Sequence, residues 1–105
     1  MKTSDVIIVG SGASGLFNAL FLPQDYKVIV ITKKEVEESD SFLAQGGISA
    51  LKNPEDYDSY FEDTMKAGHY ENDKGAVEKM IKESPQIIQD LKDFGVRFDL
   101  KDGEI

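Results

Sequence analysis

Three glycines near the amino terminus have the spacing of a phosphate-binding turn. Gly10, Gly12 and Gly15 form the pattern G-x-G-x-x-G between the apolar runs 5–9 and 16–22. In such a turn the first glycine bends the chain out of a strand, the second lets backbone approach a pyrophosphate, and the third lets helix and strand pack closely. The helix N-terminus adds free N–H groups and partial positive charge. This context favours a dinucleotide site over a merely structural turn. The candidate binding residues are Gly10, Ser11, Gly12, Ala13, Ser14 and Gly15.

A second group of candidate side chains follows the next apolar run. Residues 26–33 predict a buried strand, with Thr32 and Lys33 at its end. Dinucleotide-binding folds often hold the ribose hydroxyls with an acidic residue about 20 residues after the glycines. Glu35 satisfies that spacing, whereas the strand register favours Thr32 for a ribose hydroxyl and Lys33 for a phosphate. The alternative for Lys33 is a solvated loop lysine.

The third candidate segment is Ser-Phe-Leu-Ala-Gln-Gly-Gly-Ile-Ser-Ala-Leu, residues 41–51, which follows a polar loop predicted over 33–40. A simple surface turn does not need its apolar flanks. A helix or strand interior does not favour Gly46 and Gly47, because each glycine there costs about 0.5–1 kcal/mol against Ala. One explanation is a Gly-Gly hinge between a loop and a short helix.

The elements that must position these residues form an α/β arrangement. A strand at 5–9, a helix at 16–22 ended by Pro23, and a strand at 26–33 predict a βαβ unit over residues 1–33 with a right-handed crossover. The continuous apolar runs indicate strands buried on both faces of a parallel sheet. The helix is apolar nearly all round, so we expect it to be buried on several sides.

Helices are predicted to follow over residues 53–95. Asn-Pro begins the first, and glycine ends it, over residues 53–68. A second helix is expected from about residue 73, and Ser-Pro predicts its restart as a new helix over 84–95. Residues 96–100 alternate between apolar and polar side chains, which indicates a short exposed strand followed by a turn.

With residues 58–68, Asp-Ser-Tyr-Phe-Glu-Asp-Thr-Met-Lys-Ala-Gly, these motifs resemble the flavoprotein family of L-aspartate oxidases and of succinate dehydrogenase and fumarate reductase flavoprotein subunits. The resemblance covers essentially the whole chain. It implies the N-terminal, incomplete part of a Rossmann-like FAD-binding domain, with catalytic residues beyond Ile105. In that family the glycine pair places bare backbone amides against the flavin ring, and Ser41 and Gln45 add side-chain hydrogen bonds. The residues so implied are Asp40, Ser41, Phe42, Leu43, Ala44, Gln45, Gly46 and Gly47.

One position separates members of the family. Succinate dehydrogenases and fumarate reductases have Arg-Ser-His-Thr before this segment, and the histidine bonds covalently to FAD. This chain has Asp40 at that place, which implies non-covalent FAD and matches the L-aspartate oxidase branch, as does Gly-Val-Arg-Phe-Asp at 95–99. The branch oxidises L-aspartate to iminoaspartate, with oxygen or fumarate as electron acceptor, for NAD synthesis through quinolinate.

Two alternatives remain open at this point. One is a soluble flavoprotein of the fumarate reductase or succinate dehydrogenase type. The other, from a different class, is a stand-alone, non-catalytic nucleotide-binding module that is complete within 105 residues. Tight nucleotide binding by this chain alone would favour the module, and turnover of succinate would favour the first alternative.

Composition narrows the remaining classes of partner and site. The net charge of -8 argues against a nucleic-acid partner. With no cysteine there is no disulfide or thiolate metal site, which suits a cytoplasmic location. No metal-binding constellation, signal peptide or membrane span is predicted, and His69 fits a solvated loop better than a catalytic role. Because two strands leave sheet edges open, we expect the isolated chain to self-associate.

Overall fold

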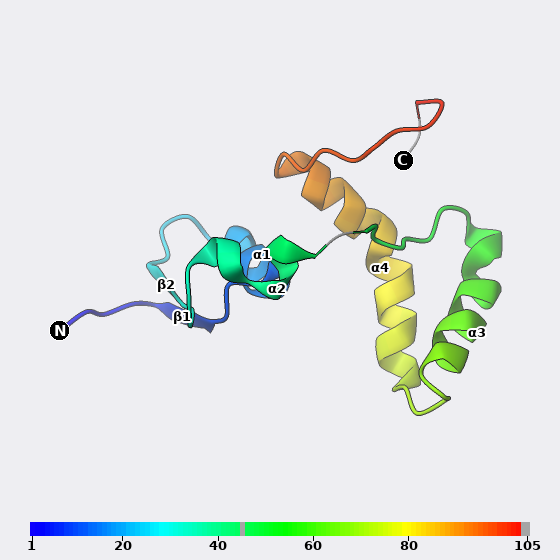
Figure 1. Ribbon diagram of the computed structural model, residues 1–105, viewed down its shortest axis with the longest axis horizontal. Helices are drawn as coiled ribbons and strands as arrows, with labels where there is room; N and C mark the ends of the chain where they lie inside the picture. Colours follow the sequence, from blue (N-terminus) through cyan, green and yellow to red (C-terminus); the bar gives the residue numbers. More distant parts are fainter. Residues whose placement is uncertain (45, 104–105) are drawn as a thin grey trace. The chain divides into compact units, whose positions relative to one another are not determined.

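The computed structural model describes residues 1–44 and 46–103. The chain divides into two compact units, Met1–Gly46 and Gly47–Ile105. The first unit contains β1 (Val6–Val9), α1 (Ala13–Phe21), β2 (Val28–Ile31), the 3₁₀ turn η1 (Val36–Glu38) and α2 (Asp40–Leu43). The second contains the 3₁₀ turn η2 (Pro54–Asp56), α3 (Tyr57–Ala67) and α4 (Lys74–Asp93) (Figure 1).

The first unit is the predicted βαβ arrangement. β1 and β2 pair in parallel, with Val6 opposite Val28 and Val9 opposite Ile31, and α1 forms the connection between them. A parallel pair needs such a crossover because the chain must return to the end of the sheet at which the first strand began before the second strand can start. The α/β fold class predicted from the sequence is confirmed.

The sheet of the first unit has one poorly covered face. Ile7 and Val9 are 60% and 82% exposed, whereas Val6 and Ile8 on the opposite face are half-buried. The prediction that both strands are buried on both faces is wrong for the described residues, because neither β1 nor β2 contains a fully buried residue. The prediction for the helix is also wrong, because α1 contains no buried residue. Within the described residues of the first unit, α1 packs on β1, and Ile7 and Val9 are exposed.

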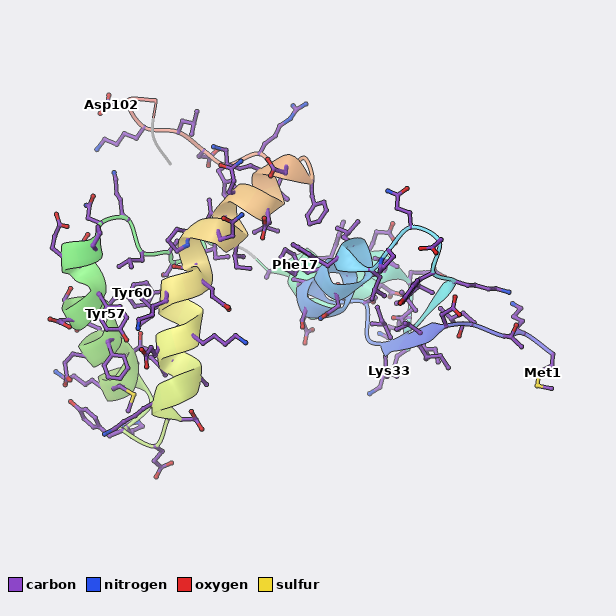
Figure 2. The ribbon with its side chains drawn as sticks, turned by 180° about the vertical axis from the view of Figure 1, so that it is seen from behind. Met1, Phe17, Lys33, Tyr57, Tyr60 and Asp102 are labelled. Atoms are coloured by element: carbon purple, nitrogen blue, oxygen red, sulfur yellow. The ribbon has the colours of Figure 1, made fainter. Side chains whose placement is uncertain are left out.

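The second unit is a pair of packed helices. Met65 from α3 and Val77 and Ile81 from α4 form its buried core. Tyr57 and Tyr60 pack around this core, and they project from α3 on the side of α4 (Figure 2). The ends of the helices follow local rules, since α3 stops at Gly68 and the Asp73 side chain caps α4 by accepting from the Ala76 N–H at 2.8 Å.

The helix predicted to restart at Ser84 is instead one continuous helix. α4 runs through Pro85 for 20 residues. Proline lacks the N–H that would reach the carbonyl of Ile81, four residues earlier, and this usually interrupts a helix. Here the hydroxyl of Ser84 donates to that carbonyl at 2.7 Å. The side chain thus supplies the hydrogen bond that proline removes, and the helix continues.

Three smaller expectations also differ from the structure. Residues 96–100 form no strand in the described chain, because a strand needs a neighbouring backbone to complete its hydrogen-bond ladder. The predicted loop at 33–40 contains η1 and the first residue of α2. Pro54 begins η2, and the α-helix itself begins at Tyr57. The turn predicted after residue 100 is confirmed, with positive φ angles of 55° and 80° at Asp102 and Gly103.

Candidate functional site

A pocket of ≈ 580 Å³ lies in the first unit, at the carboxyl ends of β1 and β2. In parallel sheets this edge is where ligands bind, because the loops that leave the strands diverge there. The pocket combines residues from the glycine turn, from the end of β2 and from the η1–α2 segment. Its lining residues are Val9, Gly10, Ser11, Ile31, Thr32, Lys33, Lys34, Glu35, Glu38, Ser39 and Asp40.

The first and last glycines of the turn have structural roles that the sequence predicts. Gly10 has φ of 111°, a conformation that side-chain-bearing residues rarely adopt. A Cβ atom at position 15 would lie 2.2 Å from the carbonyl oxygen of Gly10 and 3.2 Å from Cγ2 of Ile8. Only glycine therefore allows α1 to approach β1 this closely. The predicted turn and packing roles of these two residues are confirmed.

The missing side chain of Gly12 leaves room for Ser41. A Cβ atom there would lie 3.1 Å from the Oγ of Ser41. This hydroxyl accepts a hydrogen bond from the backbone N–H of Ala13 at 2.9 Å, in the first turn of α1, where Gly12 provides no side-chain cap. Ser41 therefore lies at the N–H groups that a phosphate oxygen would use. A hydroxyl that accepts from Ala13 keeps its own hydrogen for donation to an anion.

Thr32 is held in place by two hydrogen bonds. Its hydroxyl donates to the carbonyl of Lys34 at 2.9 Å and lies 3.0 Å from the hydroxyl of the buried Ser11. Because a hydroxyl has one hydrogen, Ser11 must be the donor of the second bond. Thr32 therefore meets a ligand as an acceptor. A ribose hydroxyl could donate to it, which sharpens the role suggested by the sequence.

The acidic residue favoured by spacing and the residues favoured by register occupy the same pocket. β2 ends at Ile31, so Thr32 and Lys33 follow the strand directly. Glu35 lines the pocket together with both. Spacing and register thus point to neighbouring positions rather than to competing ones. The role of Lys33 toward a phosphate stays a prediction.

Sequence patterns did not point to Glu38 and Ser39, which also line this pocket. Ser39 caps α2, since its hydroxyl accepts from the backbone N–H of Phe42 at 3.2 Å. A serine three residues before such an N–H is a recognised helix-start signal, and it could have located α2. The cap places Asp40 in the lining and Ser41 beside α1.

The remaining predicted residues lie outside this pocket lining. Ser14 is exposed on α1, Phe42 and Leu43 are 62% and 66% exposed on α2, and Ala44 follows that helix in an extended conformation. Gln45 lies outside the described residues.

The glycine pair has a less obvious structural basis. Gly46 has φ of 125°, which favours glycine for conformational reasons. Gly47 does not have a positive φ, and no atom of the described chain lies within 4 Å of an added Cβ. Neither backbone conformation nor packing in residues 1–44 and 46–103 requires glycine at this position. Gly47 is exposed, and its contact with a ligand stays a prediction.

Other kinds of site find little support. In the part of the chain that the structure describes, no three His, Asp or Glu side chains are grouped as a metal site. His69 is exposed in the connection between α3 and α4. None of the described helices combines the length and apolar character needed to cross a membrane.

Two exposed side chains of the second unit, Tyr70 and Lys82, have pKa values raised by a neighbouring carboxylate. The pKa of Tyr70 is raised because its hydroxyl donates to the Glu62 carboxylate at 2.6 Å. The pKa of Lys82 is raised by its hydrogen bond to Glu78. Tyr70, in the connection between α3 and α4, and Lys82, on α4, are both exposed at the surface, so their pKa shifts identify no acid–base site.

The pocket and the turn together fit a dinucleotide cofactor. The α1 N-terminus presents N–H donors, Ser41 supplies a hydroxyl beside them, and Thr32 offers an acceptor at the end of β2. Gly15 keeps the helix close to the strand, so that these groups share one edge of the sheet. This donor set matches a pyrophosphate next to a ribose.

Comparisons with known proteins also indicate a dinucleotide cofactor. The FAD binding domain family matches residues 5–105. An L-aspartate oxidase from Clostridium perfringens is 44% identical over 98 residues, which cover 93% of this chain and 22% of the relative. Enzymes of the same name from Synechocystis and Bacillus subtilis are 46% and 37% identical, covering 90% and 94% of this chain but 17% and 19% of theirs. The chain therefore spans about a fifth of these relatives' length. No solved structure matches it.

Proposed function

The chain belongs to the FAD binding domain family, and from this premise we propose that it is the N-terminal FAD-binding segment of an L-aspartate oxidase. FAD is its cofactor. The observation that best supports this proposal is the hydrogen bond from the Ala13 N–H to Ser41, which places a hydroxyl at the start of α1. Residues 1–33 form the βαβ part of the proposed domain and 53–95 its helical part. Residues 1–105 are then an incomplete portion of that domain.

The proposed roles of the chain's residues follow from their contacts. The Ala13 N–H already donates to Ser41, so the other N–H groups in the first turn of α1 bind the pyrophosphate, and Ser41 donates its hydroxyl hydrogen to it. Thr32 accepts from a ribose hydroxyl, because its own hydrogen is already bonded to the Lys34 carbonyl. Lys33 adds a positive charge at the same pocket. Gly46 and Gly47 present backbone amides to the flavin ring. When bound, FAD supplies the hydride-accepting chemistry, and the protein orients it.

Attachment of the cofactor is proposed to be non-covalent. Asp40 lines the pocket at the place where covalent members of the resembling family have histidine. A carboxylate does not form the histidyl–flavin bond. Affinity must then come from hydrogen bonds and charge at the turn and the pocket.

The proposed reaction of the whole protein is the oxidation of L-aspartate to iminoaspartate. The reaction removes two electrons and two protons from the substrate; bound FAD would accept the hydride, a base would accept the proton, and oxygen or fumarate would take up the electrons. The product serves NAD synthesis through quinolinate, in the cytoplasm. The groups that bind substrate are expected beyond residue 105. The names of the relatives support this reaction, since each is an L-aspartate oxidase.

Substrate turnover by the full-length protein tests the proposal. We expect L-aspartate, and not succinate, to bleach the flavin absorbance under anaerobic conditions. Bleaching by succinate alone would favour a dehydrogenase of the succinate type. A purified full-length protein with no flavin and no FAD binding would overturn the proposal as a whole.

A further inference from the structure

Ser84 connects two segments of the second unit that are far apart in the sequence. Its side chain is buried, with 8% exposed. The hydroxyl donates to the Ile81 carbonyl at 2.7 Å and accepts from the backbone N–H of Leu51 at 2.8 Å. One side chain of α4 thus holds the backbone of the extended segment that begins at Gly47.

The direction of these hydrogen bonds is set by Pro85. Because proline has no N–H, the carbonyl of Ile81 lacks its usual helical donor. The single hydrogen of Ser84 goes to that carbonyl, so the oxygen of Ser84 meets Leu51 as an acceptor. The two bonds also polarise each other, since the same hydroxyl gives and receives. The proline within the helix therefore creates an oriented acceptor for the incoming segment.

A second helix holds the same segment. The hydroxyl of Tyr60, on α3, donates to the Ser49 carbonyl at 3.2 Å. The Leu51 side chain packs against the core of Met65, Val77 and Ile81. Residues 49–51 are therefore fixed by one accepted bond, one donated bond and one apolar contact. Gly47, two residues before Ser49, has no described atom near its Cβ position.

We propose that Ser84 and Tyr60 are positioning residues for the flavin. They fix residues 49–51 to the helix pair, so that the Gly47 backbone reaches FAD already ordered. A glycine-rich segment loses more conformational freedom on binding than other sequences, and this loss opposes affinity. Anchoring the segment in advance reduces the loss. This role rests on the proposed FAD-binding function. It assigns to α3 and α4 the task of holding residues 49–51 in place through Tyr60 and Ser84.

The first experiment removes the hydroxyl by Ser84→Ala in the full-length protein. This variant leaves the Leu51 N–H without its acceptor and the Ile81 carbonyl without its donor. We expect the dissociation constant for FAD to rise about fivefold to tenfold, the affinity ratio that corresponds to one buried hydrogen bond. Flavin fluorescence quenching measures binding, and thermal unfolding without FAD measures stability.

A second variant separates positioning from simple support of the helix. In Ser84→Ala/Pro85→Ala the new N–H of residue 85 restores the helical bond to Ile81, but Leu51 remains without its acceptor. We expect the unfolding temperature of the apoprotein to recover while FAD binding stays weak. Pro85→Ala alone is the matched control and should bind FAD like the wild type. Recovery of wild-type affinity in the double variant, or unchanged affinity in Ser84→Ala, would overturn the proposal.

Tyr60→Phe provides an independent measurement, and it decides the question if Ser84→Ala does not fold. It removes one hydroxyl and keeps the aromatic ring in its packing. We expect FAD binding to weaken about twofold to fivefold at nearly unchanged apoprotein stability. Unchanged FAD binding would contradict the positioning role. A wild-type protein that does not bind FAD would instead contradict the proposed function, so the two failures are distinguishable.

Discussion

Gly15→Ala should test the close packing on which the candidate site depends. The added methyl group would lie 2.2 Å from the carbonyl oxygen of Gly10, more than 1 Å inside an ordinary contact of 3.4 Å. The obstructing atom is backbone, so no side-chain rotation relieves the overlap. α1 must move away from β1, and Gly10 at the phosphate turn must move as well. An added methyl group in a well-packed site costs about 1–3 kcal/mol, and we expect the upper part of that range.

The assay is urea unfolding of the full-length apoprotein, combined with a titration of FAD. A loss of about 2–3 kcal/mol is a large part of the stability of a typical domain, and FAD affinity should fall with it because the turn is displaced. Gly75→Ala is the matched control: it adds the same group in α4, where the nearest outside contact is an exposed side-chain oxygen of Asp73 at 3.3 Å. Wild-type unfolding and wild-type FAD affinity in Gly15→Ala would refute the packing argument.

Four further outcomes are expected. Gly12→Val should abolish FAD binding while far-ultraviolet circular dichroism stays near wild type, because the side chain enters the phosphate site and strikes Ser41, 3.1 Å from the Cβ position; a yellow, fully active variant would contradict this. Gly47→Ala should change the free energy of unfolding by no more than about 1 kcal/mol but weaken FAD binding. Wild-type FAD affinity in a fluorescence titration would contradict the proposed contact between Gly47 and the flavin. Acid or heat precipitation of the full-length protein should release flavin into the supernatant, since Asp40 forms no flavin bond; absorbance retained in the pellet would count against it. Residues 1–105 alone should self-associate in light scattering, because Ile7 and Val9 are 60% and 82% exposed; a stable monomer with submicromolar FAD affinity would support the stand-alone nucleotide-binding module.

The sequence by itself determined features that depend on near neighbours in the chain. A turn that needs positive φ at Gly10 requires glycine there, whatever the rest of the fold does. The caps of α3 and α4 follow from Gly68 and Asp73 in the same way. The two apolar runs with a short helix between them predict parallel strands, because parallel neighbours need a crossover connection and a helix usually provides it.

Only the tertiary structure decided features that depend on which groups meet across the chain. Ser41 and Ala13 belong to separate motifs, and their hydrogen bond exists because α2 lies at the start of α1. The exposure of Ile7 depends on which layers cover the sheet, which an apolar pattern does not specify. The continuity of α4 through Pro85 depends on whether another donor reaches the Ile81 carbonyl. Ser84 provides that donor and in turn accepts from Leu51, because a hydroxyl can do both at once where helix and extended chain are packed together.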